Sequence, residues 1–247
     1  MISGIFLGLK AYLKGTDYYL RPFVLKYFLI SGIISLSVFL ALSSVIYGYG
    51  DNLGLSIANK ISGQAIQSGI LESIISIFSR LALWIIVILI FKYIILIIVA
   101  PIMSVLSEKI EYYETGRPMD SSLSIKTQLY LIFRGTRLAV SNLSREIFIT
   151  VILLFISLIP GAIVITTPMI FLVQSYYAGF GNMDFFMERH LNNRDSRRFV
   201  SNNKGVAVAN GAVFLLLILV PFVGVFVAPT FATIAATLSG IELLDEY

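Results

Sequence analysis

Four long apolar stretches dominate the pattern of hydrophobic and polar positions along the chain. They run over residues 23–47, 81–106, 147–178 and 206–238. A helix needs about 20 apolar residues to cross the hydrocarbon core of a bilayer, so each of the first two stretches predicts one long transmembrane helix. The predicted fold is an all-α integral membrane protein, with a single helical domain over residues 1–247.

The third and fourth stretches are too long for one simple crossing, and each is interrupted by two prolines eight positions apart. The pairs are Pro160 with Pro168 and Pro221 with Pro229. Proline interrupts a helix interior, and the 13 residues from Ile147 to Ile159 extend only about 20 Å, against a core of about 30 Å. These stretches therefore predict two re-entrant, hemi-penetrating helical hairpins, at about 147–178 and 206–238, with turns buried in protein or lining a wet cavity. The alternative is one long kinked crossing per stretch.

The first 14 residues predict an amphipathic helix on the cytoplasmic interface. Lys10 and Lys14 are four residues apart and lie away from its apolar face. The apolar face is formed by Ile2, Ile5, Phe6, Leu9, Tyr12 and Leu13.

Composition supports the membrane assignment and excludes several kinds of chemistry. Of the 247 residues, 57% are hydrophobic and 13% are charged, whereas charged residues make up about a quarter of a soluble domain. The chain has no cysteine, which excludes disulfides, thiolate metal sites and cysteine catalysis. A single histidine, His190, leaves no basis for a histidine-rich metal site.

The placement of basic residues predicts the topology. Three lie in the segment ending at Arg21, six in 107–146 and five in 179–205, but only two lie in the linker 48–80. If both hairpins turn back, the three richer segments share one face of the membrane, whereas two complete crossings would move 179–205 outside. The positive-inside rule favours the first arrangement and predicts that both termini are cytoplasmic.

No catalytic motif is present. The chain has no glycine-rich loop for phosphates, no dinucleotide fingerprint and no nucleophile elbow. Glu108 and Glu111 are compatible with an acid pair, but a solvated helix face is the favoured interpretation. We therefore expect neither an enzyme nor a cofactor, and no nucleic-acid partner.

The best candidate for binding a small anion is Arg21, preceded by Leu20 and followed by Pro22. Proline suits the first turn of a helix, which would direct free backbone N–H groups toward Arg21. An arginine fork beside a helix N-terminus suits an oxyanion. The alternative is an interfacial arginine that reaches lipid phosphates.

A basic patch between the two hairpins is the second candidate, as a vestibule that gathers anions. Its alternative is an amphipathic helix attracted to anionic lipid. Two further lysines, Lys26 and Lys92, lie within apolar stretches, where charge is costly and often functional. The patch comprises Arg189, His190, Arg194, Arg197, Arg198 and Lys204.

Several motifs together resemble those of a known family. Ala100-Pro101-Ile102 is followed by Leu106-Ser107-Glu108, and Ile159-Pro160-Gly161 comes later. The segment from Asp184 to His190 is similar to the family's Asp-Tyr-Pro-x-x-x-His. In their order and spacing, these motifs resemble the CysZ sulfate permease family, within the etoposide-induced membrane protein superfamily.

The resemblance implies two long crossing helices, two pairs of hemi-penetrating helices, homo-oligomers, and sulfate uptake that feeds cysteine biosynthesis without ATP. The family's Gly-Leu/Ile-Arg-Arg motif, associated with sulfate binding, aligns with Tyr19-Leu20-Arg21-Pro22, where only the first arginine is kept. The predicted function is a sulfate or related oxyanion permease of the bacterial inner membrane. The alternative is a non-transporting membrane organiser that binds anionic lipid or a protein partner.

Overall fold

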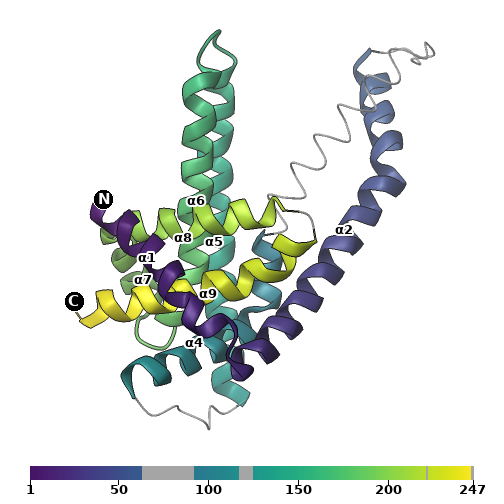
Figure 1. Ribbon diagram of the computed structural model, residues 1–247. Coiled ribbons are helices and arrows are strands. Elements are labelled where there is room, and N and C mark those ends of the chain that lie inside the picture. The colour runs from purple at the N-terminus through teal and green to yellow at the C-terminus, as the bar shows by residue number, and fades with distance from the viewer. Residues whose placement is uncertain (63–91, 117–124, 221, 246–247) are drawn as a thin grey trace. The chain divides into compact units, whose positions relative to one another are not determined.

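The computed structural model describes residues 1–62, 92–116, 125–220 and 222–245, and all regular secondary structure in these ranges is helical (Figure 1). The predicted all-α class is therefore confirmed. A short helix, Lys92–Ile98, precedes α4. The labelled helices are α1 (Ile2–Tyr19), α2 (Pro22–Ser62), α4 (Ala100–Thr115), α5 (Ile125–Ser157), α6 (Ile163–Met187), α7 (Asn193–Asn202), α8 (Lys204–Ile218) and α9 (Val223–Asp245).

The chain divides into two compact units. The first combines Met1–Ser35 with Ile95–Tyr247 and contains α1, the start of α2, and α4 to α9. The second is Leu36–Ile94, which contains the rest of α2. Both candidate sites described below lie in the first unit, and a single domain over the whole chain stays a prediction.

Four helical segments are long and apolar enough to cross a membrane. A fifth is formed if Lys92–Ile98 and α4 count as one broken span, bent by 68°. The chain is therefore a multi-pass membrane protein. The four segments are Pro22–Ser44, Phe133–Ser157, Ile163–Met187 and Phe226–Leu244.

The helix predicted over 81–106 is broken in its second half, and its crossing of the membrane stays a prediction. Residues 81–91 lie outside the described residues, and the rest bends at Val99. Pro101 follows at the first turn of α4, where it has no N–H to donate to the preceding turn and its ring displaces the carbonyl of that turn. The bend therefore lies where the sequence places a proline.

The third and fourth apolar stretches both fold into helix–turn–helix hairpins, so the alternative of one kinked helix per stretch is wrong. Helices α5 and α6 lie side by side (Figure 1), and Gly161 in their turn has a φ of 83°, which suits glycine. Helices α8 and α9 are joined at Leu219–Phe222, with Phe222 at a φ of 59°. The prediction of a half-crossing used only the 13 residues from Ile147 to Ile159. Helix α5 has 33 residues, which is long enough to cross a membrane, so re-entrance stays a prediction.

The two hairpins meet where α6 crosses α8 at a pair of glycines. A Cβ atom on Gly179 would lie 1.8 Å from the Ala207 carbonyl oxygen, and one on Gly211 would lie 1.8 Å from the Ser175 carbonyl oxygen. Small residues let helix backbones approach this closely in membrane proteins. The crossing therefore depends on residues without side chains.

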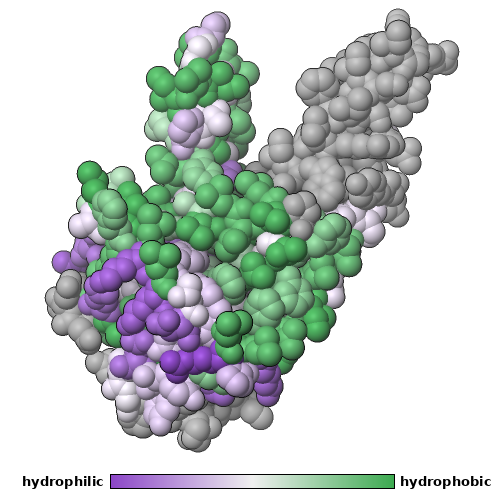
Figure 2. Space-filling model, viewed as in Figure 1, coloured by the Kyte–Doolittle hydropathy of each residue, from purple (hydrophilic) through white to green (hydrophobic). Residues whose placement is uncertain are grey.

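Helix α1 packs on α8 and α9 through its small residues and leaves large apolar residues exposed. Gly8, Ala11 and Gly15 are buried, whereas Phe6 and Leu13 are among the most exposed apolar side chains. This arrangement suits an amphipathic helix whose outer face contacts lipid. Figure 2 shows that hydrophobic residues also cover most of the projecting end of the α5–α6 hairpin.

Candidate functional site

Arg21 lies between α1 and α2, and its carbonyl group closes the first turn of α2. The N–H groups of Val24 and Leu25 donate to the Arg21 carbonyl oxygen at 2.9 and 3.1 Å. Pro22 has no N–H, so Phe23 is the only residue in the first turn whose N–H makes no such bond among the described residues. The helix N-terminus therefore offers one backbone donor near Arg21, fewer than expected from the sequence.

The Arg21 side chain lies against two aromatic rings and has no acidic partner. Its Cζ atom is 4.6 Å from the centre of the Tyr18 ring and 5.6 Å from that of Tyr113. Its Nε atom donates to the Asp17 carbonyl oxygen at 3.1 Å. In the described part of the chain, no carboxylate lies within 4.0 Å of the Arg21 guanidinium, so the outer edge of its fork is available to an anion.

Glu114, an acid near this site, already has partners. Lys14 Nζ donates to Glu114 at 2.5 Å, and the Tyr18 hydroxyl donates to its other oxygen. Burial and the neighbouring Glu114 raise the pKa of Tyr18 well above its usual value, so the hydroxyl stays protonated. Lys14 and Tyr18 therefore hold Glu114 and leave Arg21 unpaired.

The remaining residues predicted from the sequence differ in exposure. The side chains of Leu20 and Pro22 are exposed, with Leu20 at 92%, and Lys26 is exposed as well. Lys92, in the second unit, is 1% exposed, and its ammonium group lies 5.2 Å from the centre of the Tyr93 ring. The exposure of Lys26 fits an interfacial lysine, whereas Lys92 is a buried one.

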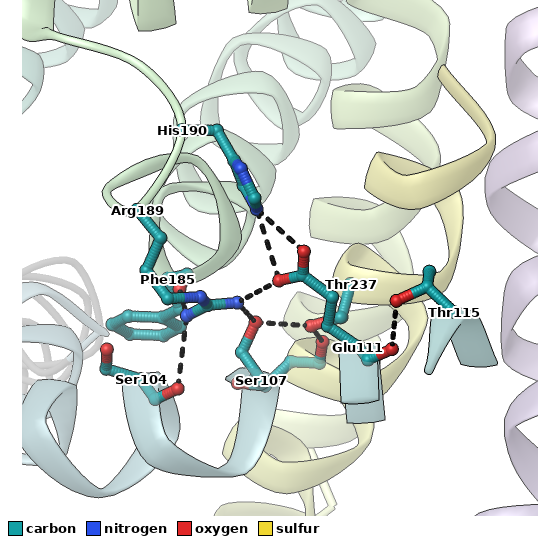
Figure 3. A network of polar contacts seen from close by, with 9 residues as sticks. Ser104, Ser107, Glu111, Thr115, Phe185, Arg189, His190 and Thr237 are labelled. Carbon is teal, nitrogen blue, oxygen red and sulfur yellow. Dashed lines mark hydrogen bonds and ion pairs between the residues drawn. The ribbon is translucent and has the colours of Figure 1, made fainter. Parts of the chain in front are cut away.

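A buried polar network joins α4, the end of α6, and α9 (Figure 3). Arg189 Nη2 donates to Glu111 at 3.1 Å and to Ser107 at 2.9 Å, while His190 Nε2 lies 2.9 Å from the other Glu111 oxygen. Thr237 on α9 donates to Ser107 at 2.8 Å. The favoured interpretation of Glu111 as part of a solvated face is wrong, because its carboxylate is buried between two basic groups.

A second ion pair lies at the base of the α5–α6 hairpin. Arg134 Nη1 is 3.0 Å from both carboxylate oxygens of Asp184. Its Nη2 donates to Ser196 on α7 at 2.8 Å and to the Leu191 carbonyl oxygen at 3.0 Å. Both side chains are buried, so this pair connects α5, α6 and the start of α7.

Glu188, just beyond the end of α6, lies between the two networks and has no arginine of its own. Ser104 donates a hydrogen bond to its carboxyl group, and Asp184 is one turn earlier. Burial, followed by the Asp184 charge, raises the pKa of Glu188 from 4.5 to about 7. This carboxyl therefore takes up a proton near neutral pH.

The predicted basic patch divides into two parts. The side chains of Arg189 and His190 contact Glu111, as described above, and His190 stays partly exposed. Arg197 donates to Ser141 on α5 at 3.2 Å. Arg194, Arg198 and Lys204 are exposed. The patch is thus not one continuous cluster, and only its exposed members remain available to a soluble ligand.

Sequence reasoning missed the partners that hold the inward-facing residues. Arg134 entered only as a topological charge, and Asp184 only as part of a motif and of the basic segment. A signal was present, because Asp184 lies between Met183 and Phe185 just beyond the apolar stretch 147–178, where an unpaired charge is costly and a partner is expected. Nothing in the sequence distinguishes Arg134 from the other five basic residues of the segment 107–146. No group of three or more possible metal ligands occurs in the described ranges.

One comparison with known proteins gives a match. Residues 11–229 match the family described as "Sulfate transporter CysZ/Etoposide-induced protein 2.4". No curated protein matches the chain. Because the match covers most of the sequence, including Arg21, the α5–α6 hairpin, and the Arg134–Asp184 and Glu111–Arg189 pairs, the chain belongs to the CysZ/etoposide-induced protein 2.4 family.

Proposed function

We propose that the chain conducts sulfate or a related tetrahedral oxyanion across a bacterial inner membrane, passively or driven by a gradient, and feeds sulfur assimilation. The observation that carries this proposal is Arg21. Its guanidinium fork lies at the start of a membrane-spanning helix and has no acidic partner among the described residues, in a family whose description includes a sulfate transporter. Dehydrating a divalent oxyanion is expensive, so a permeation path needs positive charge and N–H donors.

The surroundings of Arg21 support an anion over a cation. The rings of Tyr18 and Tyr113 hold the guanidinium plane in place through cation–π contacts. The Phe23 N–H adds a backbone donor nearby. Leu20 and Pro22 flank Arg21 in the sequence. Pro22 is the first residue of α2, so the backbone N–H of the next residue, Phe23, lies in the first turn of the helix.

We further propose that the α5–α6 hairpin enters the membrane only partway. Beyond Arg145, the last basic residue before the turn, exposed apolar residues run from Ile147 on α5 to Leu172 on α6, and Phe133 and Val140 near the start of α5 are exposed as well. The turn lies between Ile147 and Leu172, so each arm presents about 10 residues, or about 15 Å, to lipid, which is half of a hydrocarbon core of about 30 Å. If α5 and α6 each crossed the membrane completely, the segment 179–205 would stay on the same side as in a re-entrant hairpin, so charge placement alone does not distinguish these two arrangements.

Tags at both termini and within 179–205 should report the cytoplasm. Because the chain has no cysteine, Ile159→Cys at the α5–α6 turn gives a clean test of depth. Protection of this cysteine from membrane-impermeant maleimide on both sides supports a re-entrant hairpin. Labelling from the periplasm would instead show that the hairpin crosses completely. Cross-linking of the purified protein tests the proposed homo-oligomer.

Permeation is tested by uptake of radiolabelled sulfate into proteoliposomes, with binding followed by calorimetry. Arg21→Ala should weaken sulfate binding by about ten- to a hundredfold, the loss expected for a hydrogen bond between charged groups. Arg21→Lys should recover only part of the binding, because an ammonium group cannot reproduce the fork. Selenate should compete with sulfate, and chloride should compete poorly.

Lys26→Gln is the matched control, since Lys26 is an exposed cation one turn into α2. It should leave sulfate binding near the wild-type value. Wild-type protein that neither binds nor transports sulfate at millimolar concentration would overturn the proposal and favour a non-transporting membrane organiser.

A further inference from the structure

One face of α5 is largely exposed; it is mixed up to Arg145, where Phe133 and Val140 are exposed beside the arginines, and has no basic residue between Arg145 and the turn. Arg137, Ser141 and Arg145 are four residues apart and share this face, which Phe148 and Phe155 continue toward the turn. Both phenylalanines and both arginines are exposed. The last basic residue of this face therefore marks the level at which the headgroup layer gives way to hydrocarbon.

Helix α7 brings further arginines to this level. Arg197 Nη2 donates to Ser141 Oγ at 3.2 Å, so the two helices touch between Arg137 and Arg145. Ser141 is four residues from Arg145, which is about 6 Å along the helix axis. Arg194 and Arg198 lie three residues before and one residue after Arg197, and both are exposed. Arginines from two helices therefore gather just below the first lipid-facing residues.

The position of α7 is fixed by its own contacts. The Asn192 side-chain oxygen accepts from the N–H groups of Arg194 and Asp195 at 2.9 and 3.1 Å and thereby caps the helix. Phe199 is fully buried beneath it, and Ser196 accepts a hydrogen bond from Arg134. The arginines thus project from a helix that is held in place on both sides.

The exposed charges of this group are not neutralised by the protein. Among the described residues, no carboxylate lies within 4.0 Å of the guanidinium groups of Arg137, Arg145, Arg194 or Arg198. The nearby Asp195 carboxylate accepts from the Asn192 amide at 2.5 Å. Elsewhere in the same segments, Arg134 and Arg189 do have buried carboxylate partners, so the lack of partners is particular to this exposed group.

We propose that these arginines bind the phosphate group of an anionic phospholipid at the membrane surface. The site is the α5–α7 seam, defined as Arg137, Arg145, Arg194, Arg197 and Arg198. Guanidinium groups bind phosphate oxygens in a bidentate fashion. The seam favours a lipid over a free phosphate, because the exposed Phe148 and Phe155 continue the same face and provide a surface for the acyl chains.

The test compares bound phosphatidylglycerol and phosphatidylcholine on the purified full-length protein by native mass spectrometry. The variant Arg194→Gln/Arg197→Gln/Arg198→Gln should bind phosphatidylglycerol at least about tenfold more weakly, from the loss of hydrogen bonds to charged groups. The corresponding triple lysine variant keeps the charge without the forks and should recover only part of the affinity. Lys10→Gln, which removes an exposed charge from α1, should bind as the wild type does.

Three results would overturn the proposal. The first is equal binding of both lipids to the wild type, and the second is unchanged phosphatidylglycerol binding by the triple glutamine variant. The third is displacement of the lipid by millimolar inorganic phosphate, which would make the seam a site for a soluble anion. An unchanged melting temperature of the variants shows that the fold is intact, and Arg194→Gln/Arg198→Gln, which alters exposed residues only, replaces the triple variant if it unfolds.

Discussion

The α5–α6 and α8–α9 hairpins arise from similar apolar stretches but are covered in different ways. In the apolar segments of α5 and α6, 22% and 28% of the residues are buried within the protein, against 72% in α9. Both stretches have two prolines eight residues apart, and both turn back. A run of apolar residues therefore indicates that a helix avoids water, but not whether lipid or protein covers it.

The difference in covering is matched by a difference in what holds each hairpin together. The base of the α5–α6 hairpin is held by the Arg134–Asp184 pair. The α8–α9 hairpin is held by apolar packing around Phe214 and by Asn210, whose amide donates to the Ala232 carbonyl oxygen at 3.0 Å. Lipid is as apolar as a leucine side chain, so a lipid-covered hairpin gains little from apolar contacts and depends more on polar ones.

The largest expected effect comes from removing an aromatic ring from each hairpin. Phe214 on α8 is 0% exposed, whereas Phe155 on α5 is 69% exposed. Phe214→Ala should lower the free energy of unfolding by about 3–5 kcal/mol, because it leaves a cavity. Phe155→Ala should cost less than about 1 kcal/mol, because detergent or lipid fills the space. Denaturant unfolding in detergent measures both, and equal losses would show that the two hairpins are covered alike.

The second-largest expected effect comes from weakening the buried Arg134–Asp184 pair at the base of the α5–α6 hairpin. Asp184→Asn should cost about 1.5–3 kcal/mol, since Arg134 stays buried and charged with a weaker acceptor. Glu242→Gln on α9 is the matched control, because Glu242 is exposed and should change stability by less than about 0.5 kcal/mol. Thermal unfolding of both variants at one pH gives the comparison. A wild-type melting temperature for Asp184→Asn would mean that the pair does not hold the base of the hairpin.

Much of this architecture could be predicted from local sequence. The prolines and the length of the apolar stretches were enough to predict that the third and fourth stretches turn back, because a proline acts on its own helical turn. The bend at Val99 was missed although Pro101 was visible, because a proline near the start of a new helix and one inside a continuous helix look the same in an apolar run. The amphipathic pattern of α1 did not show that Gly8, Ala11 and Gly15 contact the protein.

The long-range pairs could not be predicted from sequence. Glu111 is 78 positions from Arg189 and Arg134 is 50 positions from Asp184, and composition does not say which charges meet. For example, the exposed Arg137 and the buried Arg134 lie three residues apart on α5, and the neighbouring sequence does not show which of them has a partner. Lys92 is similar, because an apolar neighbourhood predicts that its charge is costly but not where it points.

The smallest expected effect concerns the pH dependence of stability at Glu188, which lies where the base of the α5–α6 hairpin meets α4. Its pKa rises from 4.5 to about 7, mainly through burial. Between these values the folded protein holds more protons than the unfolded chain, so the stability that Glu188 contributes is complete below pH 4.5 and is lost as the pH rises through about 7. Glu188→Gln should therefore be more stable than the wild type by about 1 kcal/mol above neutral pH. This is less than the full pKa shift implies, because water reaches part of the side chain.

Unfolding measured from acid to mildly alkaline pH tests this prediction, with Glu242→Gln as a control that should follow the wild-type profile. Parallel profiles for Glu188→Gln and the wild type would show that this carboxyl is already ionised in the folded protein, and that water reaches the base of the α5–α6 hairpin as freely as its surface.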